Sequence, residues 1–219
     1  MPVKVGLQYI EKWKSSMEKE VRKYEAEPLP EEGQIVFYGP SYFTRWSERF
    51  GMVPLREEIV GRSGRPCAVN RGFGSSCAEH QLYYYSRMVR PLKPKVLVYS
   101  ALYGNGKAFG YSTAENWELA QRVLAYTMAD FPNARIYLCG SHPVRDLTDA
   151  DRADQAYWDN LLREFAEAND NCTFVDLLAY DPLLRKDIFV ADGVHFNEEG
   201  YRIYADFFRK TLKDELKQY

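Results

Sequence analysis

The feature of this chain that most constrains its fold is a repeated pattern: a short apolar run, then a turn, then a segment with helical spacing of apolar residues. The apolar runs span residues 34–38, 67–69, 96–102, 135–139 and 172–176, and the helical segments span residues 78–89, 113–131, 149–169 and 201–216, with a further one beginning at Tyr42. Strands that alternate with long helices need right-handed crossovers, so the strands run mostly parallel and helices cover both faces. The sequence therefore predicts an α/β fold, a three-layer α/β/α sandwich with a mostly parallel five-stranded sheet.

The size of the chain favours one domain. With 219 residues, 46% of them hydrophobic, it can bury one sizeable core, and no linker, low-complexity tract or internal repeat divides it. Ahead of the first strand, apolar residues recur every three or four positions from about Leu7 to Ala26, which is the pattern of an amphipathic helix. We therefore expect an N-terminal helix within residues 1–30 that packs on a single domain formed by residues 31–219.

Composition and charge argue against several classes of function. The 29 Lys and Arg and 31 Asp and Glu residues are interspersed and give a formal charge of -2, so no basic patch suggests a nucleic-acid partner. No apolar run approaches the length of a membrane span, and the first residues lack the apolar core of a signal peptide, so we expect a cytoplasmic protein. The four cysteines and three histidines show no metal-ligand spacing. We expect neither a metal nor an organic cofactor. The sequence does not determine the oligomeric state, and a homo-oligomer is one of the possibilities.

Polar residues suited to acyl transfer follow the predicted strands. Ser41 comes after the first strand, a turn at residues 72–76 after the second, and Asn105 after the third, while Asp192 and His195 lie in the loop before the last helix. Because ligands of a parallel sheet bind beyond the carboxyl ends of its strands, these groups are expected at one edge of the sheet. A hydroxyl, a base, an acid and backbone donors are what acyl transfer requires. The sequence therefore predicts a hydrolytic site at that edge.

Three of these positions also have a simpler structural interpretation. Ser41 could act only as the N-cap of the helix that follows it, and Asp192 could only form an Asx-turn beside Gly193. His195 could be a polar surface residue, but Asp192 is three positions away, so its carboxylate can hold Nδ1–H and leave Nε2 as a base. We therefore favour the catalytic interpretation for the Asp192 and His195 pair, and for Ser41 only in combination with that pair.

The order of these blocks resembles the SGNH, or GDSL-type, hydrolase family. The blocks are Gly39-Pro40-Ser41, Val69-Asn70-Arg71-Gly72-Phe73-Gly74, Gly104-Asn105 and Asp192-Gly193-Val194-His195-Phe196-Asn197, and the likeness extends from about residue 10 to the C-terminus. The resemblance implies a flavodoxin-like sandwich and an esterase or lipase that cleaves acyl esters, including acetylated sugars, without a cofactor. It also implies Ser41 as nucleophile, Asp192 and His195 as acid and base, and Ser41, Gly74, Ser75 and Asn105 as donors to the oxyanion.

Three positions depart from the family pattern. Pro40 stands where the family usually has Asp or Ser, Ser75 falls where it has its oxyanion glycine, and Gly104 precedes Asn105 directly. These departures leave a second hypothesis open, namely a family member that binds a carbohydrate or acyl ligand without hydrolysing it. The fold alone leaves a third, a nucleotide- or flavin-binding domain. The interpretation we favour is a serine esterase that forms an acyl-enzyme. The substrate of this esterase would be a small-molecule ester, with small acyl groups carried by a carbohydrate or a lipid.

Overall fold

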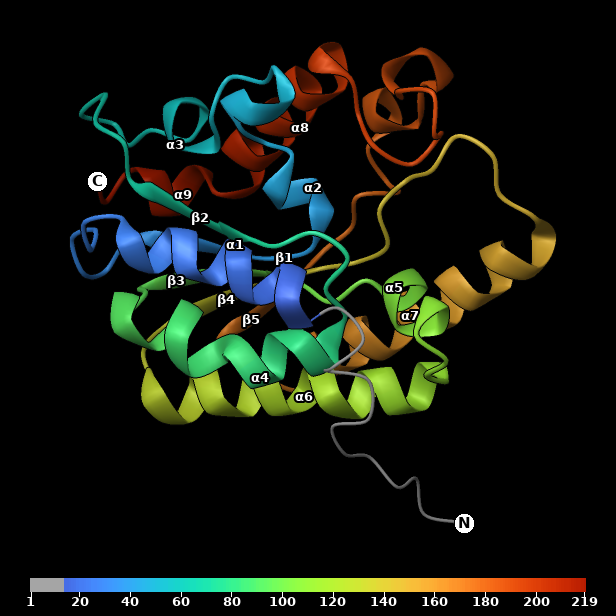
Figure 1. Ribbon diagram of the computed structural model, residues 1–219, viewed down its shortest axis with the longest axis horizontal. Helices are drawn as coiled ribbons and strands as arrows, with labels where there is room; N and C mark the ends of the chain where they lie inside the picture. The colour runs from blue at the N-terminus through green and yellow to red at the C-terminus, as the bar shows by residue number, and fades with distance from the viewer. Residues whose placement is uncertain (1–13) are drawn as a thin grey trace.

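The computed structural model describes residues 14–219, which form a five-stranded sheet between two layers of helices (Figure 1). The strands are β1 (Ile35–Gly39), β2 (Ala68–Gly72), β3 (Val96–Ser100), β4 (Arg135–Cys139) and β5 (Cys172–Val175). Their order across the sheet is β2-β1-β3-β4-β5, and every neighbouring pair is parallel. The predicted three-layer sandwich with a parallel five-stranded sheet is confirmed.

Helices cover both faces of the sheet and bury a hydrophobic core on each. One core lies under α1 (Lys14–Ala26), α4 (Ala78–Met88), α6 (Thr113–Asp130) and α7 (Asp149–Glu167). The other lies under α2 (Ser41–Thr44), α3 (Leu55–Glu58), α8 (Glu198–Thr211) and α9 (Lys213–Leu216). Figure 1 shows α4 and α6 below the sheet and α3 and α8 above it. Every residue of the central strands β1 and β3 is buried, as expected for strands that are covered on both faces.

The strand order changes direction beside the carboxyl end of β1. From β1 the chain crosses to β2 in one direction, and from β2 it crosses back over β1 to β3. The connections that leave β1 and β3 therefore diverge, and such a switch point leaves a crevice in which ligands bind. Ser41, the second residue after β1, lies at this point.

Several element boundaries differ from the prediction. β2 continues to Gly72, whereas the apolar run predicted for this strand ends at residue 69, so residues 70–72 extend the strand. Residues 103–108 form helix α5 (Tyr103–Ala108) where the sequence predicts a loop. The glycines of α5 obscure the helical pattern in the sequence. Gly106 is required by the packing of α5 on α6, because a Cβ there would lie 2.5 Å from Asn116. The last predicted helix begins earlier, at Glu198 behind its cap Asn197, and consists of the two helices α8 and α9.

Only part of the predicted N-terminal helix is described. α1 begins at Lys14, and the part predicted from Leu7 to Trp13 lies outside the described residues. Met17 and Val21 are buried in the core that α1 shares with α4. Among the helices of residues 14–219, none is long and apolar enough to cross a membrane.

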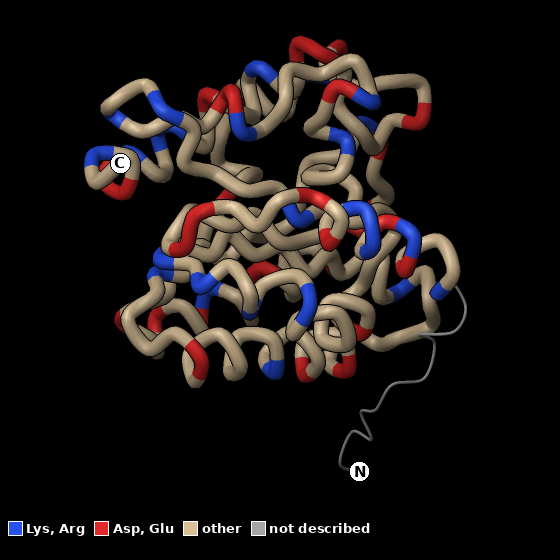
Figure 2. Tube along the Cα trace, turned by 60° about the vertical axis from the view of Figure 1, so that its left-hand side comes forward, with Lys and Arg blue, Asp and Glu red and all other residues tan. Residues whose placement is uncertain are grey.

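Charged residues of both signs are spread along the described chain (Figure 2). Some of them tie α1 to α4, where Arg87 lies 2.8 Å from a Glu18 carboxylate oxygen and 2.7 Å from one of Glu25. These side chains are partly exposed, so each pair contributes at most about 1 kcal/mol. The buried apolar side chains of α1 are therefore its main attachment to the domain.

A glycine at the end of β2 allows α2 to lie directly on the sheet. A Cβ on Gly72 would collide with the backbone nitrogen of Thr44 and lie 2.7 Å from the carbonyl carbon of Phe43. We expect Gly72→Ala to lower the free energy of unfolding by about 1–3 kcal/mol, because the added carbon forces α2 away from β2. Gly104→Ala is the matched control, since nothing lies within 4 Å of its added carbon. Urea denaturation checks both, and parent-like stability of Gly72→Ala would contradict the close contact.

Candidate active site

The carboxyl end of the sheet brings together the residues that the sequence analysis selects. Ser41 begins α2 after β1, the 74–76 turn joins β2 to α4, Asn105 lies in α5, and the 192–195 loop precedes α8. Hydrogen bonds connect these segments in pairs, joining Ser41 to His195 and Asn105 to Ser76. Two pairs of segments that are far apart in the sequence thus meet at this end of the sheet.

Ser41, His195 and Asp192 form a continuous hydrogen-bonded chain. Ser41 Oγ lies 2.8 Å from His195 Nε2, and His195 Nδ1 lies 2.8 Å from Asp192 Oδ2. An ionised carboxylate only accepts hydrogen bonds, so it favours the tautomer with the proton on Nδ1. Nε2 of the neutral ring is then an acceptor for the Ser41 hydroxyl proton, which is the arrangement that a general base requires.

Ser41 does not serve as a helix cap. The N-cap of α2 is Pro40, and no side chain caps this helix. α2 is a single turn, Ser41–Thr44, so its helix dipole is small. The cap interpretation of Ser41 is therefore wrong, and the hydroxyl is left to its contact with His195.

Asp192 shapes its loop with one carboxylate oxygen and holds the histidine with the other. Oδ1 accepts hydrogen bonds from the backbone N–H groups of Val194 and His195, each at 2.9 Å. Gly193, which lies between Asp192 and Val194, has a φ of +70°, a conformation that L side chains rarely adopt. Asp192 therefore forms the turn and contacts the imidazole at the same time, because each contact uses a different oxygen.

The same contacts set the charges of the pair. Burial raises the pKa of Asp192, but the hydrogen bonds from the His195 side chain and from the backbone of His195 and Val194 outweigh it and lower the pKa to about 2. Burial lowers the pKa of His195 below its usual value, and the hydrogen bond to Asp192 opposes this change. At neutral pH the pair is therefore a carboxylate beside a largely neutral imidazole.

The 74–76 turn offers unpaired backbone donors. Within residues 14–219, the N–H groups of Ser41, Gly74 and Ser75 have no hydrogen-bond partner. The left-handed residue of the turn is Ser75, with a φ of 61°, which agrees with the family glycine falling on this position. Asn105 Nδ2 donates to the Ser76 carbonyl at 2.8 Å and so holds the turn. The role of these groups as oxyanion donors stays a prediction.

The two other histidines are buried and have structural partners. His142 Nε2 lies 2.7 Å from the hydroxyl of Tyr204, and burial lowers the pKa of His142 to about 3. His80 Nδ1 accepts from the backbone N–H of Cys77 at 3.3 Å, and burial lowers the pKa of His80 to about 4. Both imidazoles are therefore neutral at ordinary pH. In the part of the chain that the structure describes, no three His, Cys, Asp or Glu side chains gather as a metal ion would require.

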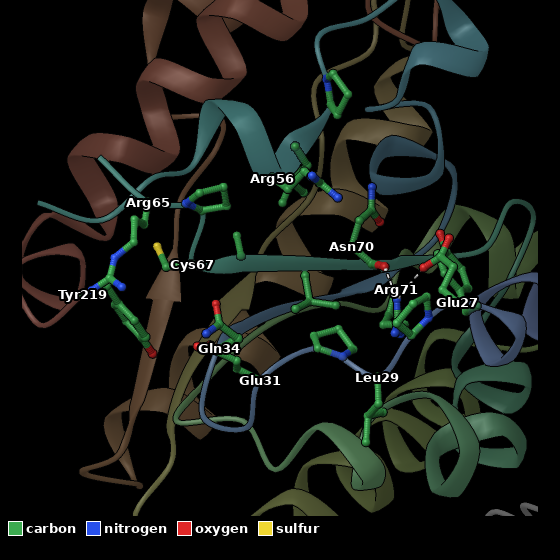
Figure 3. A pocket seen from close by; sticks show the side chains of 18 of the residues that line it. Glu27, Leu29, Glu31, Gln34, Arg56, Arg65, Cys67, Asn70, Arg71 and Tyr219 are labelled. Atoms are coloured by element: carbon green, nitrogen blue, oxygen red, sulfur yellow. Dashed lines mark hydrogen bonds and ion pairs between the residues drawn. The ribbon is translucent and has the colours of Figure 1, made fainter. Parts of the chain in front are cut away.

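A groove of about 1080 Å³ runs along the free edge of β2 (Figure 3). At one end of this groove the guanidinium of Arg71 lies 3.7 Å from Glu27 and 4.7 Å from the centre of the Tyr24 ring. Figure 3 shows Arg71 beside Glu27 at the end of the strand. None of the residues assigned above to the candidate site lines this groove. The groove is therefore separate from the place where Ser41 meets His195.

Comparison with known proteins relates the whole arrangement to one family. The model of the GDSL-like lipase/acylhydrolase family matches residues 38–203. A GDSL-like lipase from Bacteroides thetaiotaomicron is similar in structure, with 16% identity, a TM-score of 0.70 and coverage of 92% of this chain and 98% of that chain. A family 3 carbohydrate esterase from Clostridium thermocellum has 18% identity, a TM-score of 0.65 and coverage of 86% and 98%.

The fold also recurs in a psychrotrophic esterase from Pseudoalteromonas sp., with 13% identity, a TM-score of 0.69 and coverage of 84% of this chain and 99% of that chain. At such low identities these likenesses show a shared fold. No curated protein matches the chain.

The pKa of His195 should fall further when Asp192 is replaced. The hydrogen bond and charge of Asp192 raise the pKa of His195 against the larger effect of burial, so Asp192→Asn leaves only the lowering effect. A ¹H–¹⁵N NMR titration should place the midpoint of His195 below 6.5 in the parent protein and lower still in Asp192→Asn. The titrations of His142 and His80 serve as internal controls and should not change. A rise of the His195 midpoint in Asp192→Asn would contradict the pairing.

The left-handed conformation of Ser75 predicts a stability difference between two substitutions. Ser75→Gly should raise the free energy of unfolding by up to about 1 kcal/mol, because glycine adopts positive φ without steric cost. Ser75→Val should lower it by about 1–3 kcal/mol, since a β-branched residue is strained there. Urea denaturation measures both, and a valine variant as stable as the glycine variant would argue against the conformation.

Proposed function

The chain belongs to the GDSL-like lipase/acylhydrolase family and is thus an ester hydrolase, and from this premise we propose that it is a serine esterase with Ser41 as nucleophile. The observation that carries the proposal is the 2.8 Å hydrogen bond between Ser41 Oγ and His195 Nε2, in a chain that continues to Asp192. Ser41 has no capping role that would account for this contact. Family membership also sets aside the nucleotide- or flavin-binding alternative.

Acylation begins when His195 Nε2 accepts the hydroxyl proton of Ser41 while Oγ bonds to the carbonyl carbon of the ester. The carbonyl electron pair moves to oxygen, and the N–H groups of Ser41 and Ser75, with Gly74 and Asn105, are proposed to stabilise this oxyanion. Asp192 accepts the Nδ1–H bond and stabilises the imidazolium. The bond from carbon to the alcohol oxygen then breaks, and the alcohol leaves with the proton from Nε2.

Deacylation repeats these steps with water. His195 Nε2 accepts a proton from water, whose oxygen bonds to the acyl carbon on Ser41. The second tetrahedral intermediate expels Ser41 Oγ, which recovers its proton from Nε2. The products are the carboxylic acid and the alcohol, and the site returns to its starting protonation state.

We propose small acyl groups on a carbohydrate or a lipid as the substrate. The similarity to a carbohydrate esterase from Clostridium thermocellum supports an acylated carbohydrate, and the similarity to a lipase from Bacteroides thetaiotaomicron supports a lipid ester. Both proteins share the fold with this chain at low identity, so the substrate rests on analogy, whereas the nucleophile rests on the geometry of Ser41.

Hydrolysis of p-nitrophenyl acetate and butyrate tests the proposal. We expect turnover by the parent protein and a loss of about 10³-fold or more in kcat for Ser41→Ala and His195→Ala, because these residues act as a unit. Ser47→Ala is the matched control, since among residues 14–219 its hydroxyl bonds only to the Thr44 carbonyl, at 2.9 Å, and it should keep parent-like turnover. Circular dichroism confirms that each variant is folded.

A fluorophosphonate probe separates a working site from one that only binds. It should label the parent protein and Ser47→Ala but not Ser41→Ala, because only an activated serine reacts. If the parent protein neither turns over the esters nor is labelled between pH 6 and 9, the proposal fails. The alternative of a member that binds without catalysis would then be the better explanation, with Pro40 and Ser75 as the first positions to revert.

A further inference from the structure

We propose that Tyr42 is a positioning residue for hydrolysis, one that ties the loop carrying His195 to the turn of helix carrying Ser41. This inference rests on the proposed roles of Ser41 and His195. Tyr42 follows the serine directly in α2 and is 1% exposed. Its hydroxyl lies 2.8 Å from the carbonyl oxygen of Val194 and 3.2 Å from that of Pro143.

The backbone carbonyl groups of residues 193–195 accept hydrogen bonds from different parts of the chain. The Gly193 carbonyl accepts from the backbone N–H of Arg145 at 2.7 Å, and the His195 carbonyl accepts from that of Val190 at 2.8 Å. Those two bonds hold the loop to itself and to the segment after β4. Only the Val194 carbonyl, which accepts from Tyr42, is bonded to the helix that begins with Ser41.

A second link between α2 and the loop is much weaker. Arg45 Nη2 lies 3.9 Å from Asp192 Oδ2, and the two side chains are 31% and 42% exposed. A partly exposed ion pair at this distance fixes geometry poorly. The buried hydroxyl of Tyr42 is therefore the stronger of these two links between α2 and the loop that carries His195.

The ring of Tyr42 is itself held in place. It stacks on His142 with centroids 4.1 Å apart, and the edge of Phe196 packs against it at 5.4 Å. Its backbone carbonyl accepts from the hydroxyl of Tyr201 at 2.9 Å. Burial raises the pKa of Tyr42 well above its usual value, so the hydroxyl keeps its proton and stays a donor between pH 6 and 9.

Loss of this hydroxyl should affect the chemical steps more than substrate binding. His195 acts in both acylation and deacylation, so a looser loop slows whichever step limits kcat. A misplacement of the base by about 1 Å costs about 10²-fold in rate. We therefore expect Tyr42→Phe to lower kcat for p-nitrophenyl acetate about 10- to 100-fold, with KM within about 3-fold of the parent value.

Tyr137→Phe is the matched control. Tyr137 in β4 is also a buried tyrosine, and its hydroxyl contacts Glu215 Oε1 in α9 at 3.1 Å rather than the 192–195 loop. Tyr137→Phe should lose stability as Tyr42→Phe does, because each loses a buried hydroxyl contact, but it should keep parent-like kcat. All assays are run well below the melting temperature of each variant, so that unfolding does not lower the rate.

Two further measurements distinguish positioning from general weakening. Fluorophosphonate labelling of Ser41 should slow in Tyr42→Phe in proportion to kcat, and the downfield ¹H resonance of His195 Nδ1–H should broaden. 4-Aminophenylalanine at position 42 keeps the ring and a weaker N–H donor, so its kcat should lie between those of the parent protein and Tyr42→Phe. If Tyr42→Phe does not fold, this third variant alone is informative, because a parent-like kcat would overturn the proposal.

The outcomes separate this inference from the function on which it rests. If Ser41→Ala retains activity, the proposed function fails and Tyr42 has no base to position. If Ser41→Ala and His195→Ala are inactive while Tyr42→Phe matches Tyr137→Phe in kcat and labelling rate, the esterase stands and the positioning role is wrong. A rise of KM with unchanged kcat in Tyr42→Phe would equally overturn it.

Discussion

The position of Ser41 depends on the close contact between α2 and the carboxyl end of the sheet. A Cβ on Gly39 would lie 2.9 Å from the ring of Phe43, and one on Gly72 would collide with the backbone of α2. Asn70 completes the contact, because its Nδ2 donates to the Phe43 carbonyl at 2.7 Å and its Oδ1 accepts from the Gly72 N–H at 2.8 Å. A helix of one turn is not stable alone, so this packing provides its order.

The other half of the site depends on a single carboxylate. Asp192 closes the turn through Oδ1 and holds the imidazole of His195 through Oδ2, so the shape of the loop and the tautomer of the base are coupled. Its pKa is lowered to about 2, and its contribution to stability is therefore present above pH 4 and is lost as the pH falls toward 2. The side chain is 42% exposed, so this contribution is small beside that of the buried core.

The sheet could be predicted because alternating segments determine the strand ends, and the contact between Asp192 and His195 because the acid lies three residues before the histidine. The contact between Ser41 and His195 spans 154 residues, and no local signal indicates it; the expectation came from the order of blocks that resembles the family. The role inferred for Tyr42 could not be predicted, because its partner Val194 is 152 residues away and a buried tyrosine looks like any other core residue. Helix α5 was missed for a similar reason, since Gly106 is explained only by Asn116 in another helix.

The free edge of β2 is a place where another polypeptide could add a strand, because an edge strand presents unpaired backbone groups. The register with β1 turns the backbone groups of Asn70 and Gly72 outward. The chain occupies several of them itself: Gly72 N–H bonds to the side chain of Asn70, the Gly72 carbonyl to the hydroxyl of Tyr24, and the Asn70 carbonyl to Arg71. Asn70 thus has two effects: it holds α2 against the sheet, and it occupies a backbone group that edge-to-edge aggregation would use.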